Sequence, residues 1–172
     1  MQINVSQLLK APIGTVRNYD VDGVVNIAGN DSWIQGEVKL IRTDRAILAE
    51  GKLHTEVEVA CSRCLSLFCC PLALNVEEEY FPVIDVVSGA SLHLPEEPGS
   101  FTIDEHHVLN LTEAIRQYAL LAIPMKPLCR PDCAGLCPNC GHNLNQGPCG
   151  CLSQRVDPRW SKLRNLTLAN ND

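Results

Sequence analysis

The spacing of the cysteines constrains this chain more than any other feature. Eight of its ten cysteines lie in four close pairs: Cys61 with Cys64, Cys129 with Cys133, Cys137 with Cys140, and Cys149 with Cys151. Two tetrahedral four-cysteine zinc sites require eight thiolates, and four short pairs supply that number. Each pair brings two ligands from one tight turn, so little chain entropy is lost per ligand. The spacing therefore predicts two structural zinc sites.

Composition favours metal binding over disulfides. The chain has 172 residues and is 45% hydrophobic, so a packed core can form without crosslinks. The N-terminal residues lack a basic leader followed by a long apolar run, and no stretch approaches the roughly 18 apolar residues of a membrane span. We therefore expect a cytoplasmic protein that makes no membrane contact, where paired cysteines bind metal more often than they form disulfides.

Two ways of grouping the pairs are open. The second site is the simpler assignment, because Cys137, Cys140, Cys149 and Cys151 lie within 15 residues rich in glycine. The first site would then combine Cys61 and Cys64 with Cys129 and Cys133. The competing hypothesis is one local site from Cys129, Cys133, Cys137 and Cys140, with Cys61 and Cys64 left as thiols. Cys69 and Cys70 are interpreted as small buried hydrophobes.

Alternating hydrophobicity predicts a sheet. Apolar and polar residues alternate over 46–59 and again over 72–77, which is typical of strands with one buried face. Cys61 and Cys64 lie between these runs, so we expect them at the turn of a hairpin. Residues 34–41 predict a third strand and 21–28 a weaker fourth. The expected fold class is α+β, an antiparallel β-sheet covered by one main helix.

That helix follows a long connection over residues 85–104. Asn110 can cap it, and Glu113 can close a capping box. Pro124 ends it, because the residue before a proline avoids the helical region. The apolar stripe predicted to lie on the sheet consists of Leu111, Ile115, Tyr118 and Ala122.

Three segments are expected along the chain. Residues 1–126 form the α+β sheet domain that carries the Cys61 and Cys64 turn. Residues 127–152 form a zinc-binding module, because that stretch is poor in large apolar residues and metal must order it. Residues 153–172 form a basic tail with a short helix, for which Pro158 suits the first helical position.

Charge is unevenly distributed. The net charge of −6 divides into −2 for residues 1–60, −7 for 61–110 and +3 for 111–172. The acidic total argues against non-specific nucleic-acid binding, so any RNA contact should be local and C-terminal. A solvated amphipathic tail is an equally good interpretation of the candidate contacts there, which are Arg155, Arg159, Lys162 and Arg164.

No pattern of catalysis is present in the sequence. The chain has no GxGxxG, no P-loop and no G-x-S-x-G. A catalytic zinc keeps an open position beside three protein ligands, whereas eight cysteines fill two closed shells. We therefore expect a protein that is not an enzyme and has no small-molecule substrate.

Several segments resemble the YceD family of large ribosomal RNA subunit accumulation proteins. The similarity is carried by MQINVSQLL at the start, CSRCL at 61–65, residues 124–151, and DPRWSKLRNL near the end. The eight paired cysteines match the family's motif positions residue by residue, whereas Cys69 and Cys70 do not belong to the shared pattern. The resemblance covers nearly the whole chain and implies a cytoplasmic, non-catalytic factor in large ribosomal subunit biogenesis or ribosomal RNA accumulation.

The expected partners are precursor ribosomal RNA, a large-subunit ribosomal protein, or both. The acidic middle of the chain suits a basic ribosomal protein at least as well as RNA. Two alternatives are a zinc-ribbon adaptor outside the ribosome and a thiol or zinc redox switch. Zinc shields thiolates from oxidants, so the switch ranks last.

Overall fold

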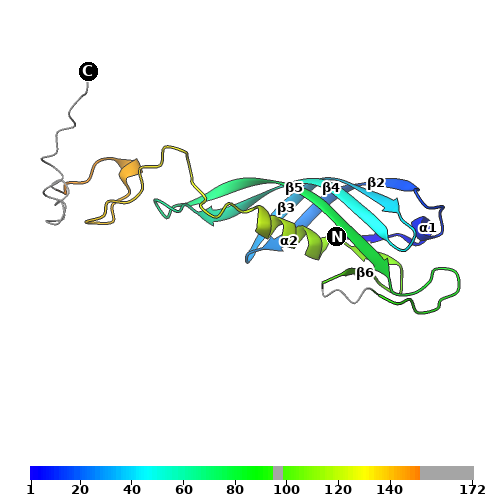
Figure 1. The fold of residues 1–172 in the computed structure, drawn as a ribbon. Coiled ribbons are helices and arrows are strands. Elements are labelled where there is room, and N and C mark those ends of the chain that lie inside the picture. The colour runs from blue at the N-terminus through cyan, green and yellow to red at the C-terminus, as the bar shows by residue number, and fades with distance from the viewer. Residues whose placement is uncertain (95–98, 152–172) are drawn as a thin grey trace, which may run out of the picture.

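The structure is a computed structural model that describes residues 1–94 and 99–151. Its architecture is one curled seven-stranded sheet with a main helix against one face and a cysteine-rich module beyond one end (Figure 1). In chain order the elements are β1 Gln2–Asn4, α1 Ser6–Leu9, β2 Val16–Ile27, β3 Asn30–Arg42, β4 Ile47–Ala60, β5 Leu67–Pro82, β6 Phe101–Ile103, β7 Val108–Asn110, α2 Thr112–Ala122 and the 3-10 turn η1 Leu144–Gln146.

The four long strands confirm the alternation pattern. Strands β2 to β5 follow one another as antiparallel neighbours. Strand β4 has the length that the sequence pattern indicated, whereas β2, β3 and β5 are longer. The expectation of a wholly antiparallel sheet is wrong, because β6 lies parallel to β5. The order is β1-β7-β6-β5-β4-β3-β2. Strands β1, β6 and β7 have three residues each, too few for a period-2 pattern to reveal them.

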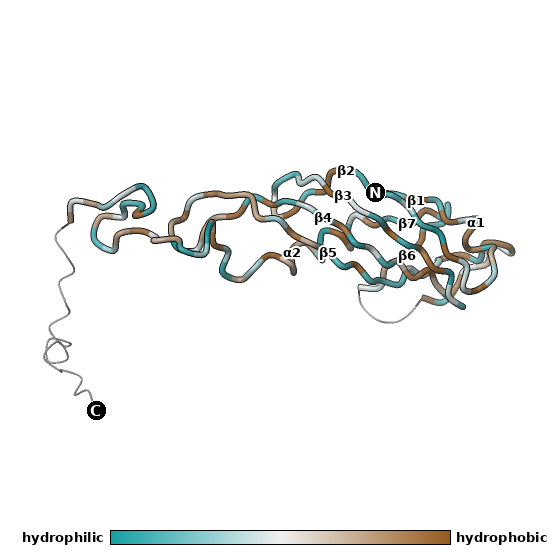
Figure 2. Tube along the Cα trace, turned by 90° about the horizontal axis from the view of Figure 1, so that it is seen from above, coloured by the Kyte–Doolittle hydropathy of each residue, from teal (hydrophilic) through white to brown (hydrophobic). Residues whose placement is uncertain are grey.

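The curl of the sheet encloses the core. Along the strands, hydrophobic and hydrophilic residues alternate (Figure 2), and the hydrophobic set points inward. Helix α2 contacts both β5 and β2, although β3 and β4 separate these strands in the sheet. The curl also brings Met1 beside Gly23 of β2. One layer of sheet thus wraps around α2 and the N-terminal residues.

Helix α2 is held by different contacts from those expected at its start. The side chain of Asn110 accepts a hydrogen bond from the Thr112 N–H at 3.0 Å. The prediction of a capping box is wrong, because Glu113 forms an ion pair with Arg116 at 2.6 Å instead. The predicted end is confirmed: Ile123, before Pro124, is extended, with φ −63° and ψ 124°. The Glu113 side chain turns outward because Arg116, one turn along the helix, competes with the backbone N–H for its carboxylate.

Two residues of the predicted apolar stripe are buried, and a third holds α2 to β5. Leu111 and Ile115 are fully buried. Tyr118 donates a hydrogen bond to the Glu77 carbonyl at 2.9 Å and lies 3.3 Å from the Glu77 N–H, which donates to its hydroxyl. Within residues 1–94 and 99–151, no helix combines the length and apolar character that crossing a bilayer demands.

Gly36 allows β3 to pack closely against β4. Its φ is +152°, and a Cβ there would collide with the carbonyl oxygen of Lys52 and lie 2.9 Å from the Leu53 Cα. Replacing Gly36 by alanine should therefore lower the free energy of unfolding by about 2 kcal/mol or more, measured by urea denaturation. Gly23→Ala is the matched control, because its Cβ meets only the flexible end of Met1 at 3.3 Å. Equal stability of the two variants would contradict this account of β3.

Candidate metal centres

The turn between β4 and β5 places the first cysteine pair. The Cys61 N–H donates to the Ser66 carbonyl, and the Leu65 N–H donates to the Cys61 carbonyl, both at 2.9 Å. Leu65 takes a positive φ of 59°, which lets the chain reverse around the pair. Cys61 and Cys64 are buried as a result. The hairpin predicted from the sequence thus presents two sulfurs at its tip.

The chain that leaves α2 returns to this tip. The Ser62 N–H donates to the Pro127 carbonyl at 2.8 Å, and the Arg63 guanidinium donates to the Cys133 carbonyl at 3.0 Å. Gly135 has a φ of +76°, and a Cβ there would lie 3.3 Å from the Arg63 carbonyl. These contacts bring the turn that contains Cys129 and Cys133 against the hairpin. The Arg63 side chain thus helps to orient that turn.

The four sulfurs of this first group have the spacing of a metal site. Cys61 and Cys133 sulfurs lie 3.7 Å apart, as do those of Cys64 and Cys129. All four lie within 4.8 Å of one another. Sulfurs about 2.3 Å from a tetrahedral zinc would be about 3.8 Å apart, whereas a disulfide needs about 2.05 Å. The geometry therefore fits metal coordination and excludes disulfide bonds.

The second group is local in the sequence. Its four sulfurs also lie within 4.8 Å of one another, and they come from Cys137, Cys140, Cys149 and Cys151. The first knuckle is closed by the Gly141 N–H, which donates to the Cys137 carbonyl at 2.9 Å, with Gly141 at a φ of +73°. The structure thus groups the cysteines as four and four. The competing arrangement, which joins the second and third pairs and leaves the hairpin pair apart, is not the one it describes.

The electrostatics of the first group call for a cation. Backbone N–H groups, that of Cys129 first, stabilise the Cys61 thiolate and lower its pKa to about 6. Burial and the neighbouring cysteine side chains raise the pKa of Cys129 to about 12. The Cys61 thiol thus loses its proton readily, whereas the Cys129 thiol retains its proton because negative charge accumulates in a small space. A bound divalent cation would stabilise all four thiolates together.

The second group repeats that pattern. Hydrogen bonds from the backbone N–H groups of Cys140 and Asn139 lower the pKa of Cys137 to about 6. The Cys140 side chain and burial raise the pKa of Cys151 to about 12. Cys140 is exposed and Cys137 is buried, so this group lies nearer to solvent than the first. Both groups therefore need a cation for full deprotonation, and the second is the more accessible of the two.

Asn145 connects the two groups. It belongs to the loop that the second group closes, yet its side-chain N–H2 lies 3.3 Å from the Cys133 sulfur of the first group. Its side-chain oxygen accepts from the Ala134 N–H at 2.8 Å and from Arg130 at 2.6 Å. Because both donors require the oxygen on their side, the N–H2 must face the sulfur. Asn145 therefore supplies an outer-shell hydrogen bond to a potential ligand.

Asn143 strengthens this connection. Its side chain donates to the Ser66 hydroxyl at 3.1 Å, so the second loop touches the hairpin turn directly. Its side-chain oxygen accepts from the Asn145 N–H at 3.0 Å. Sequence reasoning missed both asparagines, because in a glycine-rich loop an asparagine indicates only a turn. No signal in the sequence shows that their partners lie in the first group.

Other residues singled out in the sequence fall elsewhere. Cys70 is buried in the core, as interpreted, but Cys69 is exposed. The interpretation of Cys69 is wrong because adjacent strand residues point to opposite faces, so only one of the pair can enter the core. The candidate RNA contacts lie outside the described residues, and so does the predicted C-terminal helix; they are Arg155, Arg159, Lys162 and Arg164.

Comparison with known proteins gives a family. The family model described as large ribosomal RNA subunit accumulation protein YceD matches residues 49–167. The uncharacterized protein Rv2926c of Mycobacterium tuberculosis is 30% identical over 128 residues, which are 74% of this chain and 58% of that protein. The uncharacterized protein ML1660 of Mycobacterium leprae is 29% identical over 148 residues, 86% of this chain and 58% of that protein. No solved structure matches.

The chain therefore belongs to the YceD family, which confirms the resemblance seen in the sequence. The name of this family refers to the accumulation of the large ribosomal RNA subunit. The match includes all eight clustered cysteines. The chain spans 58% of the length of these two mycobacterial relatives.

Metal content tests the grouping of the sulfurs. We expect two metal ions per purified chain by elemental mass spectrometry, because each group offers a complete set of four ligands. The double variant Cys61→Ser with Cys64→Ser should lose one ion, since it removes half of one set only. Cys69→Ser is the control and should retain both ions. A hairpin variant that still binds two ions would contradict the first group.

Asn145 offers a separate test of the link between the groups. Asn145→Ala should weaken metal binding at the first group by about 10- to 100-fold, the usual effect of losing an outer-shell hydrogen bond. Competition with a chromophoric chelator measures this affinity. Gln146→Ala, at the exposed end of the same 3-10 turn, should leave it unchanged. If Asn145→Ala weakened metal binding only at the second group, the hydrogen bond from Asn145 to Cys133 would have no role in metal binding at the first group.

Proposed function

We propose that this chain is a non-catalytic, zinc-binding factor in large ribosomal subunit biogenesis. In this proposal both cysteine groups hold structural zinc, and the protein associates in the cytoplasm with precursor ribosomal RNA or with a large-subunit ribosomal protein. The observation that carries the proposal is the pair of complete four-sulfur groups within a chain of the YceD family. Family membership supplies the process, and the sulfur groups supply the physical role of the metal.

Zinc suits these groups better than the hard divalent ions magnesium and calcium do. Soft thiolate ligands favour zinc over magnesium or calcium, and a four-sulfur set matches tetrahedral coordination. A catalytic zinc needs an open position for water or substrate, and four protein thiolates leave none. The chemistry that zinc supplies here is structural, because it holds separate chain segments at one point.

The first group would fix the position of the whole cysteine-rich module. Cys64 and Cys129 are 65 positions apart, so their shared ion would close a long loop between the hairpin and the chain beyond α2. Apart from the cysteines, only Phe68, Leu128 and Leu136 pack as hydrophobic residues in this cluster of the described chain. So small a cluster cannot order residues 127–151 alone. We infer that zinc positions the module at the hairpin tip, where it can contact a partner.

The basic C-terminal tail is the proposed RNA contact. Its candidate residues are Arg155, Arg159, Lys162 and Arg164, which belong to the part of the chain that carries a net +3. Phosphate contacts of this kind add affinity without sequence preference. The sequence places this tail directly after the second cysteine group, so zinc binding would set where the tail starts.

Depletion of the protein in its host tests the function. Sucrose-gradient profiles should show a reduced large-subunit peak, restored by the wild-type chain but not by Cys137→Ser with Cys140→Ser, because that variant cannot complete the second zinc shell. Cys69→Ser serves as the complementing control. A normal large-subunit peak after depletion would remove the ribosomal role. Recovery of RNA polymerase in place of large-subunit components would favour an adaptor outside the ribosome.

A further inference from the structure

The outer face of β2–β5 is a broad surface on the side of the sheet opposite the core. Its side chains are mostly exposed in the part of the chain that the structure describes, while α1 and α2 contribute to the core on the inner side. Metal binding at the hairpin tip makes no use of this face. Its side chains nevertheless share a distinct chemistry.

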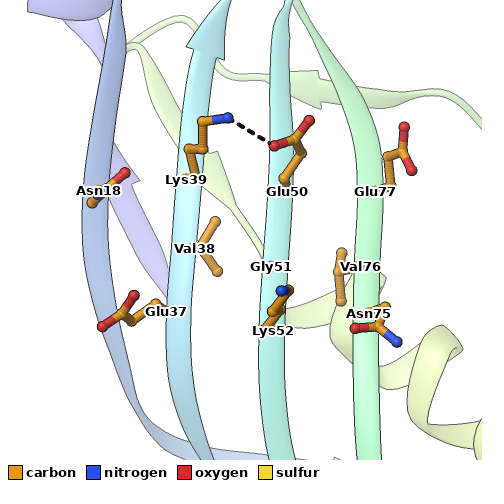
Figure 3. Close-up of a pocket in the computed structure, with 10 residues that line it drawn as sticks. All are labelled: Asn18, Glu37, Val38, Lys39, Glu50, Gly51, Lys52, Asn75, Val76 and Glu77. Carbon is orange, nitrogen blue, oxygen red and sulfur yellow. Dashed lines mark hydrogen bonds and ion pairs between the residues drawn. The ribbon is translucent and has the colours of Figure 1, made fainter.

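Negative charge dominates this outer face. Two lysines, Lys39 and Lys52, lie opposite Glu50 and Glu37 in the register of β3 and β4. Lys39 and Glu50 form an ion pair at 3.0 Å, as Figure 3 shows beside Glu37 and Glu77. Nine carboxylates against two ammonium groups leave a net charge of −7, with His54 counted as neutral. The carboxylates are Asp20, Asp22, Asp31, Glu37, Glu50, Glu56, Glu58, Glu77 and Glu79.

An exposed apolar pair lies among these carboxylates. Val24 and Trp33 are direct neighbours across β2 and β3, and they are 52% and 55% exposed. Trp33 also borders a hollow of about 540 Å³ that Glu56 and Pro71 help to line. A second hollow of about 460 Å³, shown in Figure 3, continues along the same strands. A large exposed aromatic beside a hollow and surrounded by charge is typical of a binding surface.

The sign of the charge identifies the occupant. RNA and a second copy of this face are both negative, so the face would repel them. A segment rich in lysine and arginine complements the carboxylates, and an arginine side chain can stack on Trp33 while its aliphatic stem covers Val24. We propose that the outer face of β2–β5 is a docking surface for a basic, partly apolar polypeptide segment. Identifying that segment as part of a large-subunit ribosomal protein rests on the proposed function.

The docking surface separates protein binding from RNA binding within the chain. The carboxylates attract the basic segment and set its register, and Trp33 provides the desolvated contact at the centre. Lys39 and Lys52 keep Glu50 and Glu37 partly neutralised. Asp20 on β2 and Glu77 on β5 lie on the far side of those glutamates and add negative charge to the same rows. RNA contact through the C-terminal tail would leave this surface available. The two partners would therefore not compete for one site.

Fluorescence anisotropy with a defined probe tests the surface. The probe is a short labelled peptide of Lys, Arg, Leu and Gly, and it is added to the full-length chain loaded with zinc. Asp22→Lys with Glu56→Lys should weaken binding at least about tenfold at low salt, as should Trp33→Ala. Asp44→Lys with Glu105→Lys changes the net charge equally outside this face and should weaken binding less than about twofold. Val87→Ala is the control for Trp33 at another exposed site, 84% exposed.

Each arm supports or overturns the proposal. Equal loss in both charge-reversal variants would show attraction by net charge alone, and unchanged binding in Trp33→Ala would remove the central contact. Tighter binding of a single-stranded RNA oligonucleotide than of the peptide, lost in the face variants, would assign the surface to RNA. Circular dichroism and metal content establish that each variant is folded. Because these components are purified, a normal large-subunit peak after depletion would leave the peptide result standing.

Discussion

The contact between the β4–β5 hairpin tip and the chain beyond α2 is the constraint on which the rest of the architecture depends. Two segments 65 positions apart meet with sulfurs 3.7 Å apart, close to the edge of a tetrahedron around zinc. Thiols at that spacing repel once deprotonated, so the contact needs a cation to be stable. Where that cation binds, the free energy of metal binding becomes free energy of folding for residues that have little hydrophobic core.

The same hairpin also orients the sheet. Because side chains alternate with period 2, a strand that places Leu53 and Val57 in the core must place Lys52 and Glu56 in solvent. The curl of the sheet around α2 protects the inner set. The outer set is left to solvent and carries excess negative charge, which favours solubility and selects against nucleic acid. A single sequence pattern thus produces both the core and the surface that we assign to a basic partner.

The long strands and the four cysteine pairs could be predicted from the sequence, because each has a strong local signal. Period-2 alternation marks β4 and β5, and short cysteine spacings mark each pair. The sequence left two groupings of the pairs open, since Cys61 and Cys64 meet Cys129 and Cys133 only across a long loop. Parallel strand β6 and the side-chain hydrogen bonds of Asn145 could not be predicted. Strand β6 is too short to show a period. The role of Asn145 arises only when the second loop folds back on Cys133, a contact that no local pattern encodes.

The proposed zinc binding and the proposed partner binding would be linked by geometry rather than by shared residues. Asn143 contacts Ser66 in the hairpin turn, so the second cysteine group is anchored to the same β-hairpin that contributes β4 and β5 to the outer face. The positively charged C-terminal part of the chain follows that group in sequence. A metal-ordered module at the hairpin tip therefore fixes where a basic tail begins relative to an acidic sheet. In the function proposed here, opposite charges at separate places would allow one small chain to bind RNA and a basic protein at the same time.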